Sequence, residues 1–253
     1  MGDNDGNVRW HFIFESLAYI VAFRIYVHQR SVAGDFLDTS HRWSLIVAAA
    51  VGAVIGSKLL YLAEDPAQTL RRWSDLTYLL GGKTVVGAIA GGTIAVEFVK
   101  WRTGITRRTG DLFATPLAVG IAIGRIGCFL AGIQDDTFGL PTPLAWGVTL
   151  GDGVKRHPVQ LYEIAAMLIL TLFLTRVRPP RFAEGDRFRV FVLAYFSWRL
   201  FVDFLKPGVP FAGLTVLQWT CVAAIAWYSP DLWRMISGGS KAGSKSREVL
   251  THV

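Results

Sequence analysis

The sequence predicts an all-α integral membrane protein with about seven transmembrane helices. The chain has 253 residues, of which 52% are hydrophobic, and its mean hydropathy is +0.38. The apolar residues come in blocks of roughly 18 to 25, the length that crosses a hydrocarbon core about 30 Å thick. Nine Trp, seven Tyr and 26 Gly suit a chain that meets two membrane interfaces and packs its helices closely.

Seven apolar blocks define the expected spans. The first follows a short acidic N-terminus with no cationic region and no small-residue cleavage site, so we expect a retained span rather than a signal peptide. We interpret residues 1–236 as one transmembrane domain and residues 237–253, rich in Gly, Ser and Lys, as a disordered cytoplasmic tail. The expected spans are 10–28, 43–63, 83–100, 111–133, 158–177, 187–204 and 211–233.

Basic residues in the connections predict the orientation. Fourteen Lys and Arg lie in the loops after the odd-numbered spans and in the C-terminal tail, against seven on the opposite side. This bias places the N-terminus outside and the C-terminus in the cytoplasm. The same signal accounts for the net charge of +7, so we expect no nucleic-acid partner. Cys128 and Cys221 lie inside apolar blocks, and their spacing predicts neither a disulfide framework nor a metal site.

Several polar residues lie near the expected outer ends of the spans. A charge inside a span costs roughly 2.5 kcal/mol or more, so it normally faces the bundle interior or water. Tyr195, Arg199 and Asp203 are four residues apart and form one stripe along a helix. The shared depth of these residues predicts a polar cavity open to the outer leaflet. The residues at this depth are His11, Lys58, Arg125, Arg156, His157, Tyr195, Arg199 and Asp203.

Each feature also has a purely structural interpretation. Arg199 and Asp203 would tolerate the membrane simply by forming an intrahelical ion pair. His11 is either an interfacial residue wetted by headgroups or a base oriented by Glu15, one turn deeper on the same face. The segment GGKTVVGAIAGG (81–92) lacks the Walker spacing, so we expect close helix packing there, with an anion site at a helix N-terminus as the alternative.

Four segments carry a family resemblance. They are VRW (8–10), GRIGCFLAGIQDDTFG (124–139), RHPVQLYE (156–163) and YFSWRLFVDFLK (195–206). Together they resemble the signature segments of the prolipoprotein diacylglyceryl transferase family of bacterial membrane enzymes. The resemblance covers most of the chain in order, and it implies a multi-pass protein of the bacterial plasma (inner) membrane.

The resemblance implies a transferase that works without a cofactor. The family moves the diacylglyceryl group of phosphatidylglycerol to the thiol of a lipobox cysteine in a preprolipoprotein, and glycerol phosphate leaves. Planar guanidinium groups bind phosphate oxygens bidentately and stabilise their charge. By resemblance, Arg125 and Arg199 bind the phosphate, and Asp203 orients Arg199. The residues that the resemblance adds to the catalytic or lipid site are Tyr195, Arg156, Gln160, Tyr162 and Gly139.

The chain departs from the family pattern at several positions. Val86 stands where the family has a histidine, and Cys128 replaces a signature asparagine. Asp136 is the nearest acidic counterpart of the signature glutamate. A thiol with a pKa near 8.5 is only slightly ionised at neutral pH, so transfer to it benefits from a proton acceptor. We expect His11 to be that acceptor, with Asp136 or Glu163 as alternatives.

Two further functions remain open from the sequence. One is a family-like protein that binds anionic phospholipid without transfer, or a transferase with another acceptor; the loss of the histidine at Val86 favours it. The other is a small-solute transporter, which only the spans and intramembrane charges support, since no broken-helix repeat is present. The expected partners are phosphatidylglycerol or another anionic phospholipid, a lipobox-containing preprolipoprotein and the membrane.

Overall fold

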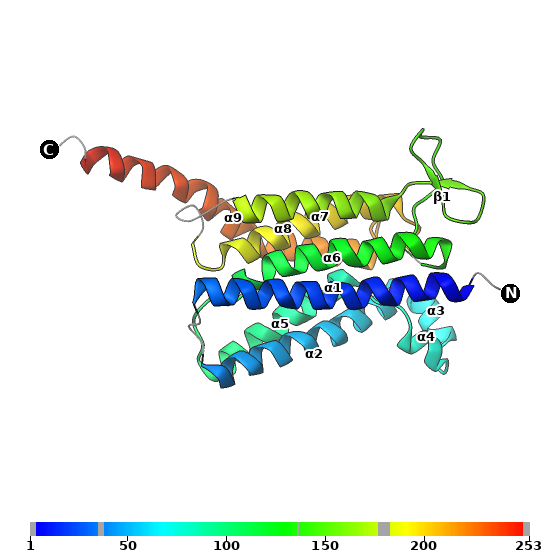
Figure 1. Ribbon diagram of the computed structural model, residues 1–253, viewed down its shortest axis with the longest axis horizontal. Coiled ribbons are helices and arrows are strands. Elements are labelled where there is room, and N and C mark those ends of the chain that lie inside the picture. Colours follow the sequence, from blue (N-terminus) through cyan, green and yellow to red (C-terminus); the bar gives the residue numbers. More distant parts are fainter. Residues whose placement is uncertain (1–3, 35–37, 136, 177–182, 250–253) are drawn as a thin grey trace. The chain divides into compact units, whose positions relative to one another are not determined.

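The computed structural model describes residues 4–34, 38–135, 137–176 and 183–249, and helices dominate it (Figure 1). The long helices are α1 (Asn4–Ala33), α2 (Thr39–Glu64), α5 (Val85–Thr103), α6 (Asp111–Ala131), α7 (Val159–Arg176), α8 (Asp186–Val202) and α9 (Val216–Val249). The short elements are α3 (Pro66–Arg71), α4 (Leu76–Leu80), the 3-10 turns η1 (Gly132–Gln134) and η2 (Asp203–Leu205), and the antiparallel strands β1 (Val148–Thr149) and β2 (Lys155–Arg156).

Four of the described helices are long and apolar enough to cross a membrane. They correspond to the first, second, fourth and fifth expected spans, and they make the chain a multi-pass helical membrane protein. Helices α5, α8 and α9 occupy the other three expected spans, but the count of seven spans and the orientation stay predictions, as do the domain limit at residue 236 and the disordered tail. The four spans are Trp10–Ala33, Thr39–Glu64, Asp111–Gln134 and Val159–Arg176.

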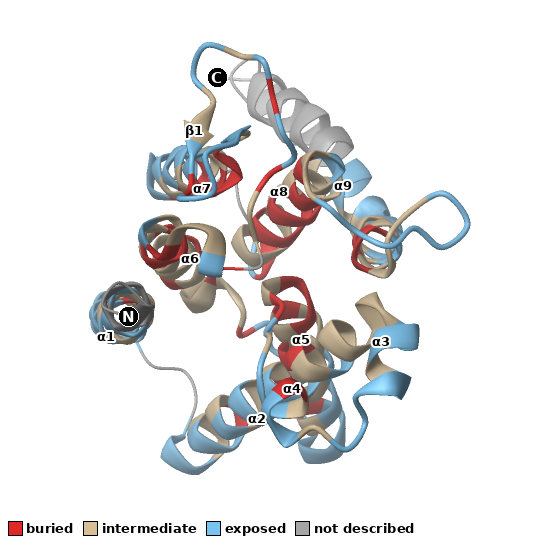
Figure 2. Ribbon diagram, turned by 90° about the vertical axis from the view of Figure 1, so that its right-hand side faces the viewer, coloured by how far each residue is buried: buried red, intermediate tan, exposed pale blue. Residues whose placement is uncertain are grey.

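The chain forms two compact units, which we describe separately. The first unit comprises Met1–Gln29, Arg108–Tyr195 and Ile225–Val253, and the second comprises Arg30–Arg107 and Phe196–Ala224. In the first unit, α6 lies between α1 and α7 (Figures 1 and 2). These three helices position most of the polar residues described below.

Glycine brings α1 and α6 together at one end of the first unit. A Cβ atom on Gly127 would lie only 2.8 Å from Phe14 Cβ and 3.3 Å from His11 Cα. The absence of that atom lets the two backbones approach closely. The beginning of α1 therefore lies against the last turns of α6.

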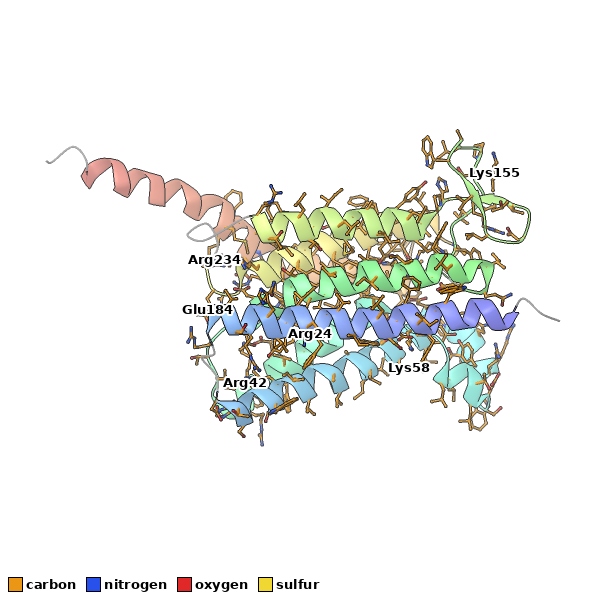
Figure 3. The ribbon with its side chains drawn as sticks, viewed as in Figure 1. Arg24, Arg42, Lys58, Lys155, Glu184 and Arg234 are labelled. Carbon is orange, nitrogen blue, oxygen red and sulfur yellow. The ribbon has the colours of Figure 1, made fainter. Side chains whose placement is uncertain are left out.

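The opposite end of the first unit holds a charged network. Asp186, which is buried, accepts from Arg234 Nη2 at 2.6 Å and from Arg189 Nη1 at 3.0 Å. Arg189 Nε also lies 2.9 Å from Asp231 Oδ2. Figure 3 shows Arg234 at this end and Lys155, on the β hairpin, at the other. The ion pairs thus fasten α8 to α9 away from the hairpin.

In the second unit, α2 and α5 cross with their backbones in contact. A Cβ atom on Gly91 would lie 2.3 Å from Gly52 O, and one on Gly56 would lie 2.3 Å from Gly87 O. Such distances leave no room for any side chain. The helix-packing interpretation of segment 81–92 is therefore confirmed.

Polar side chains fix the beginning of α5 and the end of α4. Thr84 caps α5 by accepting from the backbone N–H of Gly87, while its own N–H donates to Ser57 Oγ at 2.9 Å. Lys58 Nζ donates to the carbonyl oxygen of Leu80 at 2.6 Å and to the carbonyls of the glycines that follow it. A cation at the C-terminus of a helix satisfies carbonyls that have no intrahelical partner. Lys58 therefore has a structural role in this unit.

Candidate functional site

A buried ion pair joins α6 to α7 in the first unit. Arg125 Nε lies 2.9 Å from Glu163 Oε2, and the two side chains are 9% and 1% exposed. The hydroxyl of Tyr195, on α8 and fully buried, donates to Glu163 Oε1 at 3.1 Å. Buried charges are tolerated when they are paired and hydrogen-bonded, and here each carboxylate oxygen has a donor. The group therefore holds one guanidinium in a fixed position among three helices.

The other edge of this guanidinium meets uncharged acceptors. Arg125 Nη1 donates to Thr137 Oγ1 at 3.3 Å and lies 3.6 Å from Cys128 Sγ. Hydrogen bonds from arginine to phosphate oxygens are shorter and roughly twice as strong as neutral ones. An anionic ligand that reached Nη1 would replace weak partners with a strong one.

Gln160 is a buried amide one turn from Glu163 on the same helix. Its side chain is 0% exposed, and within the described part of the chain neither Oε1 nor Nε2 has a hydrogen-bond partner. Leaving a buried polar group unsatisfied costs about 1–3 kcal/mol. Because Gln160 and Glu163 are three residues apart on α7, they share a face of the helix. Gln160 thus offers a donor and an acceptor to a ligand beside the ion pair.

Three residues of the expected lipid site, in and beside the β hairpin, make contacts that order this segment. Arg156 donates from Nε to Asp152 Oδ2 at 2.7 Å and from Nη1 to Gly139 O at 3.3 Å. A Cβ atom on Gly139 would lie 2.3 Å from His157 O, so only glycine fits there. Tyr162 OH accepts from Trp146 Nε1 at 2.8 Å. These contacts order the segment around the β hairpin, next to the beginning of α7.

Carboxylates flank both ring nitrogens of His11. Nε2 lies 3.9 Å from Glu15 Oε2, the partner expected from the spacing, and Nδ1 lies 3.5 Å from Asp135 Oδ2. The sequence did not single out Asp135, because it follows α6 by a 3-10 turn and is distant from His11 in the chain. Asp136, an alternative proton acceptor, lies outside the described residues.

Arg199 and Asp203 form a separate group in the second unit. Arg199 Nη2 lies 3.4 Å from Asp203 Oδ1, so the expected intrahelical pair is present. Thr215 Oγ1 donates to Asp203 Oδ2 at 2.8 Å and also accepts from the backbone N–H of Gln218. Gln218 Oε1 in turn accepts from Thr215 N, which makes a reciprocal cap at the beginning of α9. The cap therefore fixes the carboxylate that orients Arg199.

Sequence reasoning missed Glu64 in this second group. Glu64 ends α2 and lies close enough to Asp203 and Arg199 to interact electrostatically with both. The available signal was an acidic residue at the end of a strongly apolar block. Val86, which by the resemblance stands in the place of a histidine, is 0% exposed on α5. Because valine has no titratable group, this position cannot accept a proton in the present chain.

The first unit thus brings together Arg125, Glu163, Tyr195 and Gln160, and places His11 near Cys128, one turn from Arg125. The second unit holds Arg199 and Asp203. Buried arginines paired with carboxylates in a multi-pass helical protein define a class: membrane proteins that hold charged groups among their helices.

Comparisons with known proteins give the family. The model of the prolipoprotein diacylglyceryl transferase family matches residues 4–229, so the chain belongs to that family, a family of transferases. The phosphatidylglycerol–prolipoprotein diacylglyceryl transferase of Clostridium tetani is 29% identical over 206 residues, which cover 79% of this chain and 81% of the relative. Proteins of the same name from Nitratidesulfovibrio vulgaris (strain Hildenborough) and Bordetella bronchiseptica are 31% and 30% identical over 240 and 239 residues. The match to the Nitratidesulfovibrio protein covers 84% of this chain and 81% of the relative. The match to the Bordetella protein covers 86% of this chain and 87% of the relative. The resemblance inferred from the four sequence segments is confirmed.

Proposed function

We propose that this protein transfers the diacylglyceryl group of phosphatidylglycerol to the thiol of a lipobox cysteine in a preprolipoprotein. The relatives are named phosphatidylglycerol–prolipoprotein diacylglyceryl transferases, and the thiol acceptor is what the family resemblance implies. The observation that carries the proposal is the buried Arg125, whose guanidinium is held by Glu163 on one edge and meets uncharged acceptors on the other. A phosphodiester headgroup supplies the charged oxygens that this edge lacks.

The reaction requires one bond to form and one to break. The acceptor sulfur attacks the glyceryl carbon that carries the phosphate, and the bond from that carbon to oxygen breaks. Glycerol phosphate leaves with the electron pair. Arg125 stabilises the negative charge of the departing phosphate, and Glu163 and Tyr195 keep the guanidinium in place. Gln160 supplies hydrogen bonds to the headgroup, and by family resemblance Arg199, oriented by Asp203, is a further phosphate ligand.

The thiol proton needs an acceptor, and we assign it to His11. Of the two residues that the sequence left as alternatives, Glu163 already accepts from Arg125 and Tyr195. His11 has one ring nitrogen facing the carboxylate of Glu15 and the other facing that of Asp135. The His11→Gln variant should lose most turnover, whereas His157→Gln, the other histidine on this side, should retain it. Full turnover in His11→Gln would remove His11 from the mechanism.

We further propose seven spans, with the N-terminus outside and the C-terminus in the cytoplasm, and a location in the bacterial plasma membrane. The excess of Lys and Arg on one side supports this orientation. Reporter fusions at Ser40, Gly104 and the C-terminus should report the cytoplasm, and a fusion at Gly153 should report the outside. The reverse pattern would move the site to the inner leaflet.

A second function follows from one observation. Val86 is fully buried and apolar at the position of the family histidine, so the chain has lost one expected polar group. A protein that binds anionic phospholipid without transferring it needs the arginines but not that histidine. This alternative predicts lipid binding with no thioether product.

The deciding experiment incubates the purified protein with isotope-labelled phosphatidylglycerol and a lipobox peptide, and mass spectrometry detects the thioether product. Arg125→Ala should abolish the product, and Arg125→Lys should restore little, because an ammonium group lacks the bidentate fork. Arg24→Ala removes an exposed arginine of α1 and should leave the rate unchanged (Figure 3). A peptide with serine in place of cysteine controls for the acceptor.

Binding of labelled phosphatidylglycerol is measured on the same samples. Binding without product in the unmodified protein would favour the second function. Binding and turnover that both survive Arg125→Ala would contradict the proposed role of the buried guanidinium.

A further inference from the structure

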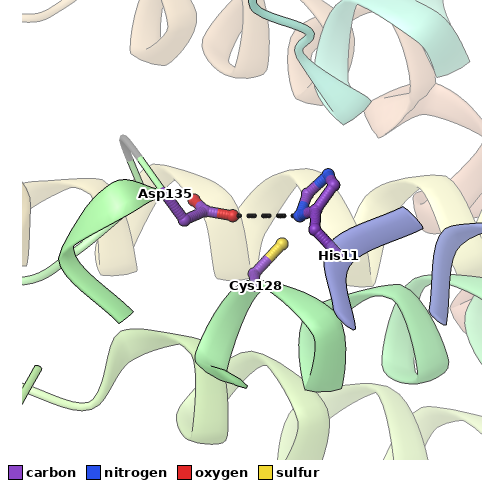
Figure 4. A group of neighbouring side chains, drawn as sticks. All are labelled: His11, Cys128 and Asp135. Atoms are coloured by element: carbon purple, nitrogen blue, oxygen red, sulfur yellow. Dashed lines mark ion pairs between the residues drawn. The ribbon is translucent and has the colours of Figure 1, made fainter. Parts of the chain in front are cut away.

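Three metal-ligating side chains meet at the end of the first unit where α1 begins. His11 lies on α1, Cys128 on the last turn of α6, and Asp135 immediately after η1. One ligand atom from each of them lies within 4.8 Å of the other two. Figure 4 shows the imidazole and the carboxylate facing each other beside the thiol. The sequence predicted no metal site, because these residues come from separate elements and have no recognisable spacing.

Neighbouring residues contact two of these side chains, Asp135 and His11. Asp135 Oδ1 accepts from the backbone N–H of Thr137 at 2.8 Å, and Oδ2 lies 3.5 Å from His11 Nδ1. On the far side of the ring, His11 Nε2 lies 3.9 Å from Glu15 Oε2. A carboxylate at the second nitrogen of a metal-binding histidine fixes the orientation of the ring and makes it a better ligand.

We propose that His11, Cys128 and Asp135 bind a borderline-soft divalent transition metal, with Zn²⁺ as the best fit. A thiolate and an imidazole select such metals over Mg²⁺ and Ca²⁺, which prefer sets made only of oxygen. Zn²⁺ takes sulfur at about 2.3 Å and nitrogen or oxygen at about 2.0–2.2 Å, so tetrahedral ligand atoms lie roughly 3.3–3.8 Å apart. The spacing of His11 Nδ1 and Asp135 Oδ2 already falls in that range. Three protein ligands leave the fourth position for water or another small ligand.

The charges around the group are compatible with a bound dication. A thiolate at Cys128 and the carboxylate of Asp135 neutralise the metal. Arg125 Nη1 lies 3.6 Å from Cys128 Sγ, and the charge of this guanidinium is compensated by Glu163. A metal on Nδ1 occupies the lone pair that would accept a proton there, so His11 serves one of its two proposed roles at a time.

The test measures metal binding rather than turnover, so it stands whether or not the proposed transfer is found. Untagged protein in detergent and reductant is stripped with a chelator, exposed to Zn²⁺ and desalted, and the retained zinc is counted by mass spectrometry. Co²⁺ serves as the spectroscopic probe, because a thiolate ligand adds a charge-transfer band in the near ultraviolet. We expect one equivalent of metal per chain and that band.

Variants separate this site from incidental binding. His11→Gln, Cys128→Ser and Asp135→Asn should each lose the metal, and Cys128→Ser should lose the band. The matched control is Cys221→Ser, which changes the other buried cysteine, on α9, and should retain both. Glu15→Gln should weaken binding by about 10- to 100-fold, as expected for a carboxylate that supports a ligand from behind.

X-ray absorption at the zinc edge needs no variant and covers the case in which a substitution disturbs folding. The unmodified protein should show one sulfur ligand near 2.3 Å, with nitrogen and oxygen for the rest. A shell without sulfur, no retained zinc, or a band that persists in Cys128→Ser would each overturn the proposal.

Discussion

Replacing Glu163 with Gln tests the buried ion pair with almost no change of shape. The substitution removes the negative charge that lies 2.9 Å from Arg125 Nε, at a position where both side chains are less than a tenth exposed. Breaking one side of a buried pair costs about 3–5 kcal/mol, because the remaining charge is left uncompensated. Tyr195 retains an acceptor in the new amide, so most of the loss should come from the guanidinium. We expect the free energy of unfolding to fall by about 3–5 kcal/mol.

The double variant Arg125→Met, Glu163→Met separates stability from function. Replacing both members of a buried pair with apolar residues of similar size is often neutral or stabilising. We therefore expect the double variant to recover most of the stability that Glu163→Gln loses, while it forms no thioether product. The measurement is unfolding in mixed micelles by increasing sodium dodecyl sulfate, followed by tryptophan fluorescence and circular dichroism.

A thermodynamic cycle with the single methionine variants gives the coupling between the two residues. A large coupling energy is expected, because each single variant leaves the other group buried without its partner. If the losses of the single variants simply add in the double variant, Arg125 and Glu163 do not interact. The reasoning from the ion pair would then be refuted.

Three further outcomes are expected. Gly91→Ala should lower the free energy of unfolding by about 1–3 kcal/mol, since the new methyl would lie 2.3 Å from a backbone oxygen of α2; Gly124→Ala, which meets no atom within 4 Å, should not, in the same assay. Thr215→Val removes a helix cap and the hydroxyl that donates to the carboxylate beside Arg199, so it should cost about 1–2 kcal/mol and also reduce turnover. The hydrogen bond from Arg156 holds the pKa of Asp152 below its ordinary value of 3.8, so this contact is fully formed above pH 3.8 and is lost as the pH falls through the lowered pKa. Carbon-13 NMR titration should show that midpoint rising toward 3.8 in Arg156→Gln, and an unchanged midpoint would contradict the assignment.

The length of the apolar blocks was sufficient to predict the fold class, because each helix must satisfy its own backbone hydrogen bonds within the membrane. The pairs expected within one helix are also present: Arg199 with Asp203, and His11 with Glu15. Their separation of four residues places them on one face whatever the rest of the fold does.

Contacts between residues of different helices could not be predicted from the sequence. Arg125 and Glu163 lie in separate segments of the resemblance, and only the packing of α6 against α7 makes them an ion pair. The proximity of Asp135 to His11 depends on the turn after α6 and on the close approach at Gly127. Such contacts depend on helix rotation and crossing, which hydropathy does not encode.

The glycine crossing of α2 and α5 bears on how the chain is made. Both helices belong to one continuous stretch, Thr39–Thr103, and the polar contacts of Thr84 and Lys58 are internal to it as well. Contacts that are local in sequence form quickly, and the N-terminal parts of a protein fold first during synthesis. All of these contacts lie within Thr39–Thr103, so the helical pair can assemble while the ribosome is still translating the later residues, including Glu163 and Arg199. It can serve as an early folding platform that is complete before the residues that carry Glu163 and Arg199 enter the membrane.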